Sequence, residues 1–398
     1  MIFKRCIPPT AAPVGLLNLI HGFIGLFYDG NRIHDFEREI KEYFQTRYVF
    51  LVSSGKAALT IILNGLASID SRAEVVIPAY TCYSVPASII RAGLKIKLCD
   101  INPDTLDYDY DKLDQVITKD TLCVVSSNLF GMPSDLKKLI ALKNKYNIFL
   151  IEDVAQAMGC RYEGNKLGTT GDAAFFSLGR GKNVTCGSGG IIITSSKMIA
   201  DAINPYYLGL PVEPRRHEVM DLVKTVVMAL FLNPWLYCLP SSLPFLELGK
   251  TFFYTDFKIY KLSRVKMWLM KGWVSRLTIA NSIREKHGRE ITGVDSGVSF
   301  LRIPYLCKTK ESAEIVRNES IINKLGIVGM YPSAICDIPE ISELFDKDNY
   351  KAAISIAERL ITVPSHQLLN SKDINTLKNY LDKDCLCFIK PDKSSFKM

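Results

Sequence analysis

The sequence lacks the features that mark several specialised classes of protein. It contains no internal repeat and no low-complexity stretch, and its 48% hydrophobic and 23% charged residues are ordinary values for a globular chain. This composition excludes a wholly disordered chain and a collagen-like or coiled-coil rod. Neither sign of charge dominates: 49 Lys and Arg oppose 41 Asp and Glu, and the net charge of +8 is too small for a dedicated nucleic-acid binder.

A disulfide framework is also missing. The 11 cysteines are odd in number and scattered from Cys6 to Cys387, whereas disulfide scaffolds are short and regularly spaced. We therefore expect buried thiols and a reducing, cytoplasmic location. Cys385 and Cys387 form a C-x-C pair, but no second pair or histidine cluster lies near them, so no metal site is expected.

No apolar run is long enough to cross a membrane, which takes about 20 residues. The stretch Leu16–Phe27 has 12 residues and follows a proline-rich segment that would interrupt a signal peptide. Its apolar residues recur at helical spacing and predict an amphipathic helix. A second run, Leu222–Leu232, is almost purely apolar and ends at Asn233-Pro234, with further prolines at 240 and 244.

Short apolar runs alternate with helical patterns of about ten residues between residues 48 and 194, and this alternation predicts an α/β fold. We expect a mostly parallel central sheet flanked by helices. A mixed pattern after residue 275 predicts a smaller α+β domain at the C-terminus. The expected parts are listed here: an N-terminal arm (1–34), a large domain (35–205), an apolar and basic insert (206–275) and a small C-terminal domain (276–398).

Two expected strand ends carry residues suited to chemistry, and ligands bind at the carboxyl ends of strands in such sheets. A small-residue turn with Gly55, Lys56 and Ala57 opens a helix. Free N–H groups at a helix start bind phosphate well, although an ordinary N-cap explains the turn equally. Asp153 ends a buried strand and either bonds a cationic ring nitrogen or caps the next helix.

The third strand end is followed by Lys182, in a glycine-rich loop where a solvated surface role explains it poorly. Lysine forms Schiff bases once its amine is partly neutral in a sheltered site. A Schiff-base lysine, an anion for the ring nitrogen and phosphate donors are together the parts that pyridoxal phosphate needs.

With these parts in order, the chain resembles the DegT/DnrJ/EryC1/StrS sugar aminotransferases, a fold-type I pyridoxal phosphate family. The resemblance covers roughly residues 30–200. It rests on six ordered motifs: Ser53 to Leu59, Val76 to Thr81, Asp100 to Leu106, Asn128 to Asp135, Glu152 to Ala157 and Phe176 to Asn183.

The resemblance implies a role for each site residue. Lys182 would hold pyridoxal 5'-phosphate covalently and later move a proton at the donor's α-carbon. Asp153 would bond the pyridinium nitrogen, and Gln156 would contact the ring or its phenolic oxygen. Ser177 would bind the phosphate of the cofactor together with the turn at Gly55, Lys56 and Ala57.

The chain departs from the family pattern mainly on the substrate side. Lys56 stands where the family commonly has Thr or Ser. Cys82 stands where a ring-stacking aromatic is usual, which makes the next residue, Tyr83, the candidate for stacking. Further departures are Asn128, Phe130, Met158 and Ser188. We interpret these changes as an altered preference for substrate or amino donor.

The family's activity implies the substrates and partners. We expect transfer of an amino group from an amino acid, with glutamate the first candidate, to a keto sugar that is usually nucleotide-linked and destined for surface polysaccharide or glycolipid. Family members are usually homodimers whose neighbouring subunit completes each site. The alternative is a non-catalytic or regulatory member of the same fold that acts at a membrane.

The insert leaves two interpretations open. Residues 211–290 hold 13 Lys and Arg against 7 Asp and Glu, so most of the net charge surrounds the apolar segment 222–248. The segment is either a buried element or dimer contact, or an interfacial segment with Trp235 and Tyr237 at the level of lipid headgroups. The basic frame favours a membrane surface or an anionic substrate over nucleic acid.

Overall fold

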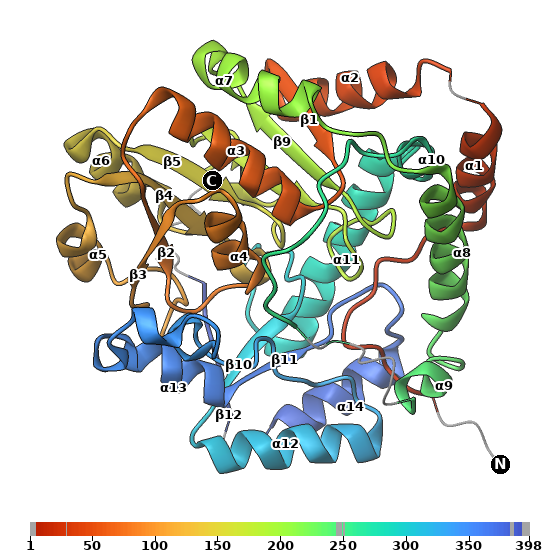
Figure 1. Cartoon of the computed structure of the whole chain (residues 1–398). Coiled ribbons are helices and arrows are strands. Elements are labelled where there is room, and N and C mark those ends of the chain that lie inside the picture. The colour runs from red at the N-terminus through yellow and green to blue at the C-terminus, as the bar shows by residue number, and fades with distance from the viewer. Residues whose placement is uncertain (1–4, 29, 244–248, 250, 383–385, 392–398) are drawn as a thin grey trace.

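The computed structural model describes residues 5–28, 30–243, 249, 251–382 and 386–391 (Figure 1). A seven-stranded sheet forms the centre, in the order β1-β9-β8-β5-β4-β2-β3. Its strands are β1 (Tyr48–Val52), β2 (Glu74–Pro78), β3 (Lys95–Cys99), β4 (Thr121–Ser127), β5 (Phe149–Asp153), β8 (Ala173–Ser177) and β9 (Gly190–Thr194). A two-stranded hairpin, β6 (Arg161–Tyr162) and β7 (Asn165–Lys166), lies outside it.

The five strands from β3 to β8 run parallel, and only β9 is antiparallel to both of its neighbours. β4 is buried along its whole length and β5 and β8 along most of theirs, whereas β3 at the edge of the sheet is partly exposed. The predicted α/β architecture with a mostly parallel sheet is therefore confirmed, and the carboxyl ends of β4, β5 and β8 meet at one edge.

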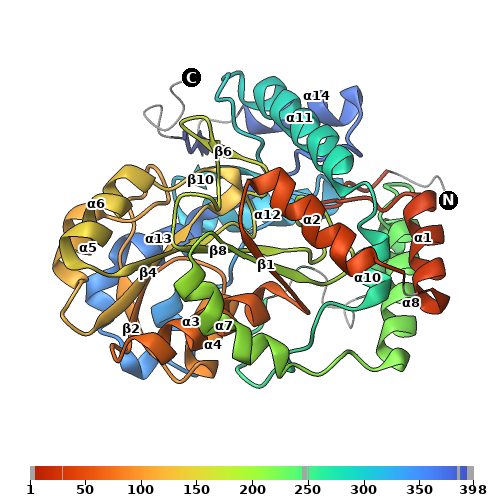
Figure 2. The same cartoon turned by 90° about the horizontal axis from the view of Figure 1, so that it is seen from above.

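Helices cover both faces of the sheet, as the view from above shows (Figure 2). One hydrophobic core contains buried residues of α3 (Gly55–Ile69), α4 (Ser84–Arg91) and α7 (Lys197–Leu208). The other core contains those of α2 (Arg32–Phe44), α5 (Tyr110–Val116), α6 (Leu136–Tyr146), α10 (Arg264–Leu269) and α11 (Trp273–Thr292). This double winding places the helix N-termini of α3 and α4 beside the strand ends.

A second, smaller sheet lies toward the C-terminus, as expected of an α+β part. It is antiparallel, in the order β11-β10-β12, with β10 (Ile303–Cys307), β11 (Leu360–Val363) and β12 (Leu386–Phe388). Three helices accompany it: α12 (Lys310–Asn323), α13 (Lys351–Arg359) and α14 (Ser371–Leu381). Cys385 of the C-x-C pair lies outside the described residues.

The remaining helices lie at the edge of the molecule: α1 (Leu16–Phe27), α8 (Arg215–Phe231) and the short α9 (Cys238–Ser241) (Figure 1). The apolar run predicted as a helix from residue 222 is the second part of α8, which begins seven residues earlier, directly after Pro214. Of the segment 222–248, residues 244–248 lie outside the described part. Among the described helices, none is both long and apolar enough to span a bilayer.

Candidate functional site

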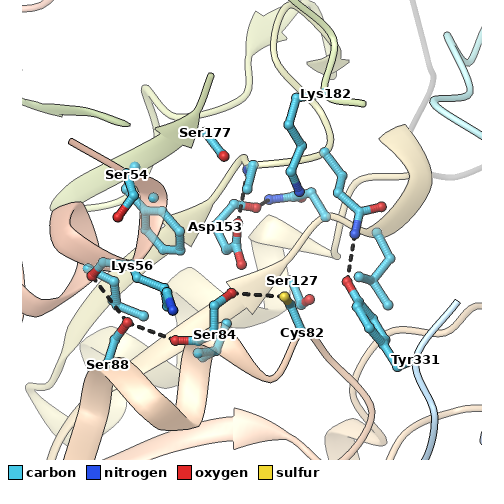
Figure 3. Close-up of a pocket in the computed structure, with 18 residues that line it drawn as sticks. Ser54, Lys56, Cys82, Ser84, Ser88, Ser127, Asp153, Ser177, Lys182 and Tyr331 are labelled. Atoms are coloured by element: carbon cyan, nitrogen blue, oxygen red, sulfur yellow. Dashed lines mark hydrogen bonds between the residues drawn. The ribbon is translucent and has the colours of Figure 1, made fainter. Parts of the chain in front are cut away.

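A cavity of about 230 Å³ opens at the carboxyl ends of β4, β5 and β8, against the first turns of α3 and α4. Figure 3 shows Asp153 near its centre, with Lys182 and Ser177 on one side and Cys82 on the other. Six of the predicted site residues line this cavity: Gly55, Lys56, Asp153, Gln156, Ser177 and Lys182. The fold thus brings together residues that lie up to 127 positions apart in the printed sequence.

Asp153 is a buried carboxylate at the last position of β5. One of its oxygens accepts a hydrogen bond of 2.9 Å from the backbone N–H of Ala155. Burial raises the pKa of Asp153 to about 6, while the same N–H and the positive charge of Lys182 lower it. A cationic partner in the cavity would therefore be stabilised by this carboxylate.

The backbone of the Lys182 loop is held from below by Arg284 of α11. The Arg284 guanidinium is fully buried and donates to the carbonyl of Asn183 and to Oδ1 of Asn281, each over 3.1 Å. It reaches the carbonyl of Lys182 over 3.4 Å. Burial lowers the pKa of Arg284 to about 10, so it stays charged at neutral pH. Because Arg284 donates to carbonyl groups and not to the Lys182 side chain, it orders the loop and leaves the lysine amine unaffected.

The N-terminal segment, residues 5–12, lies against the same loop. Thr10 donates its hydroxyl hydrogen to the carbonyl of Gly181 over 3.1 Å. Earlier in the segment, the carbonyl of Pro8 accepts a hydrogen bond of 2.8 Å from Nε2 of His366. Arg5 forms an ion pair with Asp373 at 2.9 Å. The segment therefore links the lysine loop to the C-terminal part of the chain.

The turn before α3 has the geometry of an anion site. Ser54 caps the helix by accepting from the N–H of Ala57 over 3.1 Å. Among the described residues, no acceptor bonds the N–H groups of Gly55 and Lys56, which begin the helix. A Cβ on Gly55 would stand 3.2 Å from Cβ of Ser177, so the turn packs closely on the end of β8. Ala57 is buried behind the turn and does not line the cavity.

Lys56 is engaged by two aromatic rings. Its Nζ lies 3.3 Å from the ring centroid of Tyr254 and 4.7 Å from that of Phe257. Such cation–π contacts stabilise an ammonium group without cancelling its charge. Lys56 therefore adds a positive charge at the edge of the turn, and the sequence did not predict its contact with Tyr254 and Phe257.

The structure places Cys82, and not Tyr83, in the cavity wall. The Cys82 sulfur lies 2.8 Å from Oγ of Ser84. Tyr83 immediately precedes α4 and points away, where its hydroxyl lies 2.6 Å from Oγ of Ser333. Two aromatic residues do line the cavity: Phe175 of β8 and Tyr331, from a loop of the C-terminal part.

Tyr331 and Gln156 form a buried pair at the far wall. Nε2 of Gln156 donates to the Tyr331 hydroxyl over 2.7 Å, and its Oε1 accepts from the N–H of Phe130 over 3.1 Å. Burial raises the pKa of the Tyr331 hydroxyl well above its usual value, so it stays protonated. Neither Tyr331 nor Arg284 carried a local sequence signal, because each acts from a distant segment.

The remaining departures also find places. Asn128 lines the cavity, but its amide nitrogen donates to the carbonyl of Asp153 over 2.9 Å, so it supports the strand end. Met158 and Phe130 are buried in the two cores. Among the described residues, no group of three His, Cys, Asp or Glu side chains could hold a metal ion.

Comparison with known proteins gives consistent matches. The profile of the DegT/DnrJ/EryC1/StrS aminotransferase family matches residues 24–211, just under half of the chain. GDP-perosamine synthase of Escherichia coli O157:H7 is 33% identical over 172 residues, which are 43% of this chain and 47% of the relative. L-glutamine:2-deoxy-scyllo-inosose aminotransferase of Streptomyces kanamyceticus is 33% identical over 165 residues, 42% of this chain and 38% of the relative.

The matched part of the chain spans about half the length of these curated relatives, or less. The fold, by contrast, is similar over nearly the whole chain. The solved structure of PseC from Helicobacter pylori, an aminotransferase involved in the biosynthesis of pseudoaminic acid, superimposes with a TM-score of 0.76. It covers 95% of this chain and 98% of that one at 15% identity. The likeness to the DegT/DnrJ/EryC1/StrS aminotransferase family is therefore carried by residues 24–211, which contain every predicted site residue.

Proposed function

We propose that the protein is a pyridoxal phosphate-dependent aminotransferase that moves an amino group from an amino acid to a keto sugar. One observation carries this proposal: Lys182, the buried carboxylate of Asp153 and the first turn of α3 face one cavity. The three arrive from separate strand ends, and a lysine, a carboxylate and an anion site are the groups this cofactor requires.

The chemistry of the donor set fits pyridoxal phosphate. Burial has raised the pKa of Asp153 to about 6, and a protonated ring nitrogen beside it would restore the carboxylate's charge. The N–H groups of Gly55 and Lys56, with the Ser177 hydroxyl, suit a phosphate. When bound, the cofactor supplies an electron-withdrawing ring that acidifies the α-carbon of the amino donor.

The chain's own residues then perform the remaining tasks. Lys182 would hold the cofactor covalently, and its amine would move a proton at the α-carbon of the amino donor. Asp153 keeps the ring nitrogen protonated. Gln156, fixed by Tyr331, orients the ring from the side. Arg284 holds the Lys182 backbone so that the amine starts from one position.

The substrates are a finer part of the proposal. The names of the relatives, GDP-perosamine synthase and L-glutamine:2-deoxy-scyllo-inosose aminotransferase, support a sugar-like acceptor and an amino-acid donor. We propose a nucleotide-linked keto sugar for surface polysaccharide or glycolipid, with glutamate tested first and glutamine beside it as donors. A panel of nucleotide keto sugars, assayed for turnover of the loaded enzyme, identifies the acceptor.

The cellular setting belongs to the same proposal. We propose a cytoplasmic homodimer whose neighbouring subunit completes each site, with a peripheral membrane contact through 222–248. Residues 35–205 would bind the cofactor, 276–398 would form the small domain, and 1–34 and 206–275 would be the arm and the insert. The division into domains is supported by the lining of the cavity, whose residues come from 35–205 and, with Tyr331, from 276–398.

A non-catalytic member of the fold is the second candidate, and Cys82 favours it. The thiol of Cys82 at the cavity wall has no ring that could stack on a cofactor. The side-chain amide of Asn128 already donates to the carbonyl of Asp153 and is not free to bind a ligand through that hydrogen. Such a protein would retain the fold and lose the affinity for pyridoxal phosphate.

Absorption spectroscopy separates the two candidates. The purified chain, incubated with pyridoxal phosphate and then desalted, should be yellow, and glutamate or glutamine should bleach it. Lys182→Ala should lose the visible band on desalting, while Lys97→Ala, a lysine on β3 away from the cavity, should keep it. A wild-type protein that stays colourless after incubation would remove the enzymatic proposal.

A further inference from the structure

Helices α1 and α8 carry an exposed apolar surface that the proposed reaction does not use. Both views of the chain place these helices side by side at the outer edge, away from the central sheet (Figures 1 and 2). We call this surface the apolar face. Its exposed residues are Leu16, Leu17, Ile20, Phe23, Ile24, Phe27 and Tyr28 of the first helix and its end, Val219, Met220, Val223, Val227 and Leu230 of the second, and Trp235 after it.

Helix α1 is turned with its large side chains toward solvent. Gly22 and Gly25 face inward, and a Cβ on either would stand 2.7 Å from side-chain atoms of Leu269 or Trp268. The two glycines therefore let α1 lie close to α10. The opposite side exposes Leu16 to 74% and Phe27 to 70%. A helix that buries its glycines and exposes leucine and phenylalanine is typical of a surface that binds a partner or a membrane.

Charge is sorted across α8 and the residues before it. The carboxylates point inward: Glu213 and Asp221 each lie 2.8 Å from Nζ of the buried Lys266, and Glu218 is buried with its carboxylate 3.6 Å from a guanidinium nitrogen of Arg264. This arrangement removes the negative charges of the stretch from the outer surface.

The basic residues of the same stretch are exposed, although the Arg215 guanidinium also donates to the carbonyl of Leu26 over 3.1 Å. Arg215, Arg216 and Lys224 are exposed, and Lys271 is exposed beside α1. Helix α1 contains no Asp, Glu, Lys or Arg. The pKa of its one titratable residue, His21, is lowered by burial and by nearby cations, so it is neutral at pH 7. The apolar face is thus bordered by positive charge alone within these two helices.

We propose that the apolar face docks on the surface of an anionic lipid bilayer, with α1 lying flat in the interface. The helix is about 18 Å long at 1.5 Å per residue, which suits an interfacial and not a spanning position. Phe23 and Phe27 enter below the headgroups, Trp235 and Tyr28 lie at their level, and Arg216 and Lys224 meet the lipid phosphates.

The sorted charge decides between a bilayer and a second copy of the chain. In a symmetric dimer the same surface meets itself, so the basic border of one copy would approach that of the other. An anionic bilayer offers the opposite charge along the whole border. This inference deepens the membrane contact proposed above for 222–248 by adding α1 and naming the lipid charge, and it needs neither the cofactor nor the sugar.

The test is flotation of the full-length protein with vesicles of phosphatidylcholine alone or mixed with phosphatidylglycerol. The wild-type protein should float with the anionic vesicles, and added salt should weaken binding. Arg216→Gln and Lys224→Gln should each lower the partition roughly fivefold. Phe23→Ser combined with Phe27→Ser should lower it by at least about tenfold, because two aromatic side chains leave the lipid.

Matched controls come from other surfaces. Ile321→Ser with Ile322→Ser removes two similarly exposed apolar side chains from α12, and Lys378→Gln removes an exposed charge from α14. Both should float as the wild type does. Unchanged flotation of the α1 and α8 variants would overturn the proposal. So would a dimer that the Phe23→Ser/Phe27→Ser variant turns into a monomer, since a second copy would then cover the face. The visible absorbance of the same samples reports on the proposed function independently.

Discussion

The carboxylate of Asp153 should destabilise the cofactor-free protein, and its removal should therefore increase stability. Its pKa is raised from 3.8 to about 6 by burial. A carboxyl group with a raised pKa favours folding only while it is protonated. Stability is thus lost as the pH rises from the unfolded value through the folded one.

The shift sets the size of the effect. With pKa values of 3.8 and about 6, ionisation lowers the free energy of unfolding by about 1 kcal/mol at pH 4.5 and by about 3 kcal/mol at pH 7.5. Asp153→Asn removes this loss and keeps an oxygen that accepts the N–H of Ala155. The variant should therefore be more stable than the wild type by about 3 kcal/mol at pH 7.5.

Denaturant unfolding of the cofactor-free protein, followed by tryptophan fluorescence at both pH values, measures the difference. Asp104→Asn, an exposed carboxylate in a turn, is the matched control and should show no such pH-dependent gain. A gain for Asp153→Asn that is equal at pH 4.5 and 7.5 would refute the reasoning, because the effect would then be unrelated to ionisation. In the presence of pyridoxal phosphate the order should reverse, since Asn cannot pair with a charged ring nitrogen.

Three further substitutions test the walls of the site. Gly190→Ala should destabilise the protein by several kcal/mol and weaken cofactor retention, because the new Cβ would stand 2.2 Å from the carbonyl oxygen of Ser54. Thermal unfolding measures the first effect and a desalting assay the second. A melting curve equal to that of the wild type would contradict the expectation. Tyr331→Phe should cost about 1–3 kcal/mol through the unsatisfied Gln156 amide, seen in denaturant unfolding; a neutral result means that water replaces the hydroxyl. Arg284→Met leaves the backbone carbonyl groups of Ala11, Lys182 and Asn183 without this donor and should lower the thermal midpoint and broaden the visible absorption band of the loaded protein; an unchanged band would show that the lysine loop is ordered without it.

The sequence predicted several of the residues that line the cavity because they follow a local rule. Asp153 and Ser177 are the last residues of parallel strands, and the carboxyl ends of such strands must meet at one edge. The turn at Gly55 was equally local, as it is the start of a helix. The double winding followed from the alternation of apolar runs and helical patterns, which is set by burial on both faces of the sheet.

Contacts between distant segments could not be predicted in this way. Tyr331 lies 175 positions from Gln156, which it bonds, and no spacing in the sequence relates the two. Tyr83 shows the opposite problem: it adjoins the expected position, but the start of α4 at Ser84 turns its ring toward Ser333.

Helical periodicity likewise predicted where helices lie in the sequence, but it did not predict which face of a helix is buried. The pattern in Leu16–Phe27 correctly indicated a helix, yet the glycine face is the buried one, since close packing on α10 excludes larger residues. The apolar run at 222–232 hid the start of α8, because the preceding turns are charged and bind inward to Lys266. Apolarity alone marks a helix poorly when ion pairs bury its other residues.

The position of the N-terminal segment has a consequence for how the protein matures. Residues 5–12 are synthesised well before two of the groups that hold them, since His366 lies 358 positions after Pro8 and Asp373 follows it. The segment therefore cannot make these contacts until the C-terminal part has been synthesised. Only then can Thr10 bond the carbonyl of Gly181 and close the loop beside the lysine. The order of the loop that carries Lys182 thus depends on residues from both ends of the described chain.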